Sequence, residues 1–83
     1  MKAHVYVTLK RSVLDAQGQT VAGALRRIGI SGVSDVRQGK YFVLTLDSSL
    51  AADPTRAKDE VERIAREVLT NPVIEEFSVR LEP

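Results

Sequence analysis

The chain has 83 residues, with 12 lysines and arginines, 11 aspartates and glutamates, and no cysteine. A length of 83 residues fits one small domain spanning 1–83, whose core is too small to be strongly stable without a partner chain. The formal charge of +1 gives no broad basic surface for nucleic acid or anionic lipid, and the lack of cysteine excludes disulfides, thiolate metal sites and a cysteine nucleophile.

The first predicted element is a strand over Lys2–Leu9, because apolar and other residues alternate there. One face carries Val5, Val7 and Leu9, and the other carries His4, Tyr6 and Thr8. The same alternation lacks the unbroken apolar run of a signal peptide. Since no segment approaches the ~20 apolar residues of a membrane span, we expect a cytoplasmic protein.

A helix is predicted after Asp15. Apolar residues at helical spacing define one face of it: Val21, Ala24, Leu25 and Ile28. Asp15 suits the N-cap, because its carboxylate can accept from amides of the first turn. Gly29 suits the position just after the helix.

The stretch Val33–Leu46 predicts strand structure around a turn at Gln38-Gly39. We interpret it as a tight hairpin, because glycine reaches positive φ without a Cβ clash; one long bent strand is the alternative. Arg37 and Lys40 would then flank the turn as two exposed cations, able to clamp an anion or a partner carboxylate; solubilising turn charges are the alternative.

The second helix has the clearest boundaries. Asp53-Pro54 gives an N-cap followed by proline at the first helical position, and Asn71-Pro72 ends the helix. Its apolar stripe comprises Ala57, Val61, Ile64, Ala65, Val68 and Leu69. A last strand is predicted over Val73–Leu81.

The element order is therefore β-α-β-β-α-β, an α+β, ferredoxin-like two-layer sandwich. We expect an antiparallel sheet with both helices on one face. The other face is left bare, and it mixes aromatic, apolar and polar side chains as contact surfaces do. Tyr6, Tyr41 and Val43 are its candidate residues for self-association, with an ordinary solvent-exposed sheet face as the alternative.

The residues indicate no catalytic, cofactor-binding or metal centre. His4 is the only histidine and has no spaced ligand partner. Ser12 and the serines at 31–34 lack the context of a hydrolase nucleophile. Glu75 and Glu76 are adjacent in a strand, so they point to opposite faces and make a poor acid and base pair.

Three motifs together resemble the PurS family, the small subunits of phosphoribosylformylglycinamidine (FGAM) synthase in purine biosynthesis. They are S-V-L-D-x-Q-G at 12–18, D-V-R-x-G-K at 35–40 and N-P-V-I-E at 71–75. The resemblance extends over essentially the whole chain. Ala16 departs from the proline that the family often has after the aspartate, which removes a preorganised first helical residue.

The resemblance implies a non-catalytic subunit that helps a glutaminase (PurQ-like) and a synthetase (PurL-like) subunit associate and pass ammonia. ATP and Mg²⁺ would be used by the complex, and no cofactor is expected on this chain. A homodimer or homotetramer is also implied, with no nucleic acid or membrane partner. Six residues within these motifs are candidates for partner contacts: Asp15, Gln17, Gly18, Arg37, Gly39 and Lys40. Capping or turn roles are the alternative, and for Asp15, Gly18 and Gly39 the favoured one.

Other proteins of the same topology offer alternative functions. An RNA-binding module would stack bases on aromatic residues of the central strands, but the near-zero net charge disfavours it. An acyl-phosphate hydrolase would need a glycine-rich loop after the first strand, where this chain has Lys10-Arg11-Ser12-Val13. A domain that binds a small regulatory ligand stays open.

Overall fold

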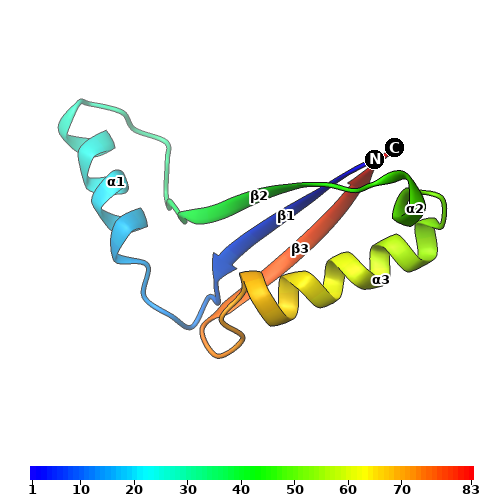
Figure 1. Cartoon of the computed structure of the whole chain (residues 1–83). Helices are drawn as coiled ribbons and strands as arrows, with labels where there is room; N and C mark the ends of the chain where they lie inside the picture. Colours follow the sequence, from blue (N-terminus) through cyan, green and yellow to red (C-terminus); the bar gives the residue numbers. More distant parts are fainter.

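The computed structural model describes residues 1–83 as a three-stranded antiparallel sheet with helices at one face and at one end (Figure 1). The strands are β1 (Lys2–Leu9), β2 (Gly39–Thr45) and β3 (Glu75–Glu82), in the spatial order β2-β1-β3. The helices are α1 (Ala16–Arg27), α2 (Ser48–Ala51) and α3 (Pro54–Ile64), which continues as the π-helical turn η1 (Ala65–Leu69). None of the helices combines the length and the hydrophobicity that a membrane span requires.

The α+β class, the first strand and most helix boundaries predicted from the sequence are confirmed. Asp15 and Asp53 are the N-caps of α1 and α3, and their side chains accept from Gly18 N and Arg56 N. Gly29 follows α1 with a φ of 86°, the left-handed conformation that glycine reaches without strain. These ends form as expected because each depends on residues close by in the sequence.

The predicted hairpin over Val33–Leu46 is wrong, because only Gly39–Thr45 forms a strand. Residues 31–38 return from α1 as an extended segment without strand pairing. Their polar groups instead bond to the loop that leaves β1, through Gln38 N and the Arg37 guanidinium. Acceptors on that loop, namely the Asp15 carboxylate and backbone carbonyl oxygens, therefore take the place of a fourth strand.

The predicted placement of both helices on one sheet face is also wrong. Only α3 covers the sheet, while α1 lies beyond the sheet end and makes no extended contact with any strand or helix (Figure 1). The radius of gyration is 16.2 Å, whereas a compact chain of this length would have about 12 Å. The single chain is therefore extended, and α1 is the reason.

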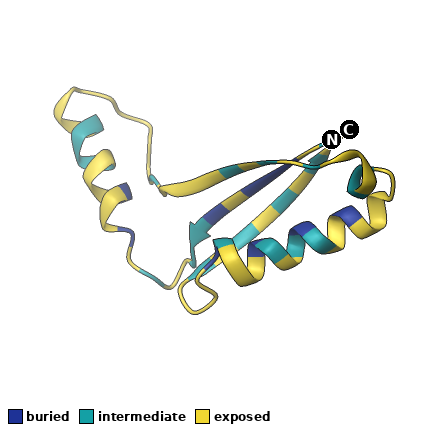
Figure 2. Ribbon diagram, viewed as in Figure 1, coloured by how far each residue is buried: buried dark blue, intermediate teal, exposed yellow.

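The core lies between β1 and α3. Fully buried side chains come from the inner face of the central strand, namely Ala3, Val5 and Val7, and from α3 and η1, namely Ala57, Val61 and Ala65. Figure 2 shows this buried band along β1 and α3, whereas α1 and the return segment are largely exposed. Only 10 of 83 residues are buried, so this core is thin and the inner face of β2 is partly uncovered.

Candidate functional site

The predicted partner-contact residues meet at the base of α1, in a cluster that we call the α1 junction. It comprises Asp15, Gln17, Gly18, Arg37 and Gln38, from the loop after β1, the first turn of α1 and the return segment. The first two residues of β2, Gly39 and Lys40, also belong to the junction. The structure therefore brings together all six residues that the motifs suggested.

Asp15 is the centre of the junction and is 4% exposed. Its Oδ1 accepts from Gly18 N at 2.8 Å, and its Oδ2 accepts from Gln38 N at 2.6 Å. These two backbone N–H groups, Gly18 first, lower the pKa of Asp15 below its ordinary value of 3.8. One carboxylate thus caps α1 and fixes the start of β2 at the same time.

Arg37 ties the return segment to the loop after β1. Its guanidinium Nη2 lies 3.1–3.3 Å from the backbone oxygens of Leu9, Lys10 and Val13. A guanidinium suits this role because its donors can satisfy several acceptors at once. The expectation that Arg37 is a free turn cation is therefore wrong, since it holds backbone within its own chain.

The two glycines of the junction allow close backbone approach. A Cβ on Gly18 would collide with the carbonyl oxygen of Val36, and a Cβ on Gly39 would collide with that of Val7. Their role within the chain is steric.

Gln17 and Lys40 keep the freest polar groups of the junction. The Gln17 side chain accepts from Gln38 Nε2 at 2.8 Å, and Lys40 Nζ lies 3.5 Å from Glu75 Oε2 with a side chain that is 60% exposed. They border an open hollow of about 180 Å³ that is also lined by Val7, Leu9, Asp15, Gln38, Gly39 and Glu75. This hollow combines a cation, amides and carboxylates and suits polar contacts with a partner protein.

The predicted self-association face lies on the side of the sheet that faces away from α3. Tyr6, Tyr41 and Val43 are 40%, 54% and 47% exposed, and the two tyrosine rings stack with centroids 5.0 Å apart. The register pairs Tyr6 with Tyr41 across β1 and β2, which explains the stack. The three residues therefore share one exposed, half-aromatic surface.

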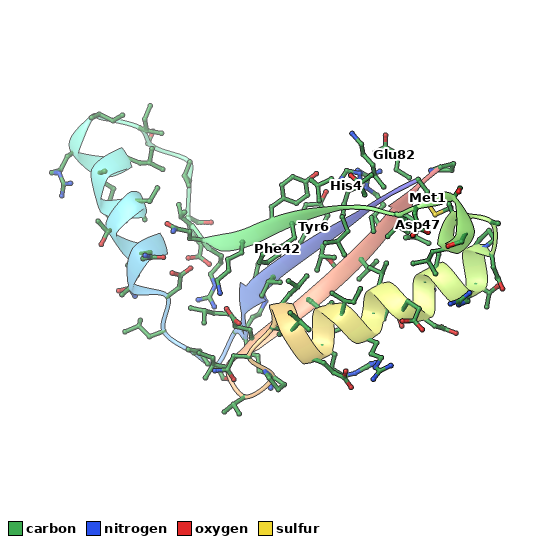
Figure 3. All side chains as sticks on the ribbon, in the orientation of Figure 1. Met1, His4, Tyr6, Phe42, Asp47 and Glu82 are labelled. Atoms are coloured by element: carbon green, nitrogen blue, oxygen red, sulfur yellow. The ribbon has the colours of Figure 1, made fainter.

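The strand alternation placed His4 on the bare face of the sheet, but its side chain is buried there, with only 7% exposed. Its Nδ1 is hydrogen-bonded to the Tyr41 hydroxyl and its Nε2 to Glu82 Oε2. Figure 3 shows His4 and Glu82 side by side near the chain termini. The hydrogen bond from His4 lowers the pKa of Glu82. Only the strand register could have indicated this contact, because His4 and Glu82 come together on one face only once β3 pairs with β1.

None of these clusters has the make-up of an active site. The junction contains no nucleophile beside a base, and no group of three histidine, cysteine, aspartate or glutamate residues could hold a metal ion. What the junction offers is a fixed polar surface.

A family model described as phosphoribosylformylglycinamidine (FGAM) synthase, PurS, matches residues 2–83. The chain belongs to the PurS family. It is 43% identical to the PurS subunit of FGAM synthase from Mycobacterium leprae, covering 98% of this chain and 95% of that protein. It is 41% identical to the PurS subunit from Bacillus subtilis, covering 98% and 92%.

Solved PurS structures share this fold. The crystal structure of Methanocaldococcus jannaschii PurS superposes with a TM-score of 0.84 at 31% identity, over 98% of this chain and 94% of that one. A chain in the structure of PurLQS from Thermotoga maritima gives a TM-score of 0.83 at 30% identity, over 95% and 93%. The three-stranded sheet and detached α1 therefore occur in a molecule with the PurS fold, and the family predicted from the motifs is confirmed.

The steric role of Gly18 generates a test on α1. Gly18→Ala should loosen the junction because the added methyl meets Val36, and amide hydrogen exchange within α1 should become faster. Gly23→Ala is the matched control, since its Cβ would have no neighbour closer than 3.8 Å. That change should slow exchange, because alanine in place of glycine stabilises a helix by up to about 1 kcal/mol. Equal effects of both substitutions would contradict the steric role.

The lowered pKa of Asp15 predicts how the junction responds to acid. The carboxylate bonds are complete above pH 3.8, the ordinary value, and are lost as the pH falls through the lower pKa of the folded state. NMR should show the amide protons of Gly18 and Gln38 shifting together with the Asp15 carboxyl carbon at a pH below 3.8. In Asp15→Asn the same amides should show no such titration; a titration that persists would assign it to another group.

Proposed function

We propose that this chain is the assembly subunit of an FGAM synthase complex and joins a glutaminase subunit to a synthetase subunit. The observation that carries the proposal is the likeness over the whole chain to PurS subunits, including one within a PurLQS structure. The junction contains no nucleophile placed beside a general base, which agrees with a role in binding rather than in catalysis. The RNA-binding and small-ligand functions are not favoured, because the family match leaves no part of the chain except Met1 outside it.

In this proposal ATP and Mg²⁺ are used by the other subunits of the complex, in the cytoplasm. The chain helps hold the glutaminase and synthetase together, so that ammonia passes between them without escaping to water. A binding role of this kind requires a rigid surface more than reactive groups, because preorganised contacts cost less entropy on association. The hydrogen bonds of Asp15 and Arg37 supply that rigidity at the junction.

We propose that one of the two larger subunits, the glutaminase or the synthetase, docks at the α1 junction through Gln17 and Lys40. Both side chains line the hollow, and Lys40 projects a partly free ammonium beside it. A carboxylate on the partner would gain charge-assisted hydrogen bonds there. Asp15, Gly18, Arg37 and Gly39 contribute indirectly by fixing the backbone that carries these two side chains.

The outer sheet face with Tyr6, Tyr41 and Val43 is proposed as a self-association surface. Its aromatic pair and exposed valine form an apolar patch, and a second copy would bury the same patch by a two-fold axis. Together with a second two-fold contact, this face would give a homotetramer, and alone it would give a homodimer.

The docking proposal predicts a selective loss of glutamine-dependent activity. In the reconstituted complex, Gln17→Ala with Lys40→Ala should lower the glutamine-driven rate near the threshold concentration for assembly. The rate with high external ammonia should fall less, because free ammonia bypasses the glutaminase. The free energy of unfolding should change by no more than about 0.5 kcal/mol, since both side chains are exposed.

The matched control is Gln19→Ala with Lys58→Ala, which removes the same side-chain types from exposed positions on α1 and α3. This control should leave both rates unchanged. If the junction variant also keeps its full glutamine-driven rate at limiting subunit concentration, Gln17 and Lys40 are not docking residues.

A further inference from the structure

Three side chains on the outer sheet face form a hydrogen-bonded chain that neither the core nor the α1 junction requires. They are Tyr41 on β2, His4 on β1 and Glu82 on β3, so the chain crosses all three strands. The His4 imidazole lies in the middle, with Nδ1 hydrogen-bonded to the Tyr41 hydroxyl and Nε2 2.6 Å from Glu82 Oε2. His4 is buried, whereas Tyr41 is 54% exposed. A buried imidazole therefore contacts an accessible phenol.

Glu82 determines which nitrogen of His4 carries the proton. A carboxylate only accepts hydrogen bonds, so His4 Nε2 has to donate to Glu82. In the neutral imidazole Nδ1 then keeps its lone pair and accepts from the Tyr41 hydroxyl. The hydrogen bond from His4 lowers the pKa of Glu82 below its ordinary value of 4.5. The nearby positive charges of Arg80 and Lys2 lower this pKa further, so the carboxylate is ionised at neutral pH.

The Tyr41 ring is held against the imidazole by stacking. Its centroid lies 5.0 Å from that of Tyr6, with an angle of 12° between the ring planes. The His4 ring is nearly parallel to it as well, at 5.8 Å and 6°. The strand register places Tyr41 directly opposite Tyr6, so backbone pairing maintains this stack. The phenol cannot turn away from His4 without losing these contacts.

The order phenol, imidazole and carboxylate is that of a nucleophile, its base and the group that orients the base. When the Tyr41 oxygen forms a bond to an electrophilic carbon, its proton can pass directly to His4 Nδ1. The Glu82 carboxylate then stabilises the imidazolium that forms. Assistance by a positioned base contributes about 10²–10⁴-fold to the rate of such steps. Tyr41 should therefore be more reactive than an ordinary exposed tyrosine.

We propose that the Tyr41 hydroxyl is a covalent modification site, which takes an acyl group from small activated acyl donors with His4 as the base. In this step the Tyr41 oxygen forms a bond to the acyl carbon, and the bond from that carbon to the leaving group breaks. The leaving group departs with the bonding electrons. The phenol proton moves to His4 Nδ1 and from there to water. The product is an ester of Tyr41, which can no longer donate a hydrogen bond to His4.

The surroundings of Tyr41 define the class of donor. None of the hollows on the chain is lined by Tyr41, so selectivity comes from the reactivity of the phenol and not from a bound substrate. The three residues are therefore a modification site and not the active site of an enzyme. Tyr6 and Val43 are exposed beside the ring, and these apolar neighbours suit a short, uncharged acyl group such as acetyl.

Tyr6 is an internal control, because it is the other tyrosine of the chain and is 40% exposed. The chain is treated with p-nitrophenyl acetate at neutral pH, at a concentration low enough to keep the outer sheet face free. Peptide mass spectrometry should then show acetylation of Tyr41 at least about tenfold faster than that of Tyr6. Equal rates, or a faster reaction at Tyr6, would overturn the proposal. This comparison needs no variant.

His4→Gln separates the base from the hydrogen bonds. A glutamine can accept from the Tyr41 hydroxyl and donate to Glu82, but its amide does not take up a proton at neutral pH. In this variant Tyr41 should react no faster than Tyr6. Tyr6→Phe, which retains a stacked ring, should leave the Tyr41 rate unchanged. A Tyr41 rate that stays high in His4→Gln would overturn the proposal. Both experiments use this chain alone, so their failure leaves the proposed function untouched.

Discussion

The structure depends on the pair of hydrogen bonds that Asp15 makes to the backbone N–H groups of Gly18 and Gln38. Through them one carboxylate starts α1 and fixes the point where the chain re-enters the sheet as β2. Arg37 closes the same junction from the other side by donating to the carbonyls of the loop after β1. Helix α1 lies beyond the sheet because the junction fixes its N-terminal turn, while its C-terminal end makes no comparable contact with the rest of the chain.

Because α1 lies away from the sheet, the single chain buries less apolar surface, which lowers its stability. The core between β1 and α3 contains mostly valine and alanine, and burial of side chains of that size contributes less than burial of leucine or phenylalanine. Phe42 and Leu44 on β2 pack against this core but are only partly buried. The fold therefore leaves apolar surface for other chains to cover, as expected of a subunit that functions within an assembly.

The sequence predicted those parts of the fold that depend on near neighbours. The alternation of Lys2–Leu9 and the Asp53-Pro54 helix start were correct because strand pattern and capping are local. The hairpin at Gln38-Gly39 was not, since Asp15 lies 23 residues from Gln38 and its bond to that amide competes with strand pairing. The burial of His4 was missed for the same reason: Glu82 lies 78 residues away. The motifs named six residues that the structure places near one another, but their division into positioning and exposed residues required the structure.

The central claim is that the junction keeps α1 away from the sheet of its own chain. Spin labels on Arg27→Cys and Lys58→Cys, both exposed positions, would report the distance between α1 and α3 by pulsed electron paramagnetic resonance. Dilution with unlabelled chain restricts the signal to one chain. We expect one narrow distribution at the long separation that this structure has between the two helices. A dominant short distance, with α1 beside α3 on the same sheet, would contradict it.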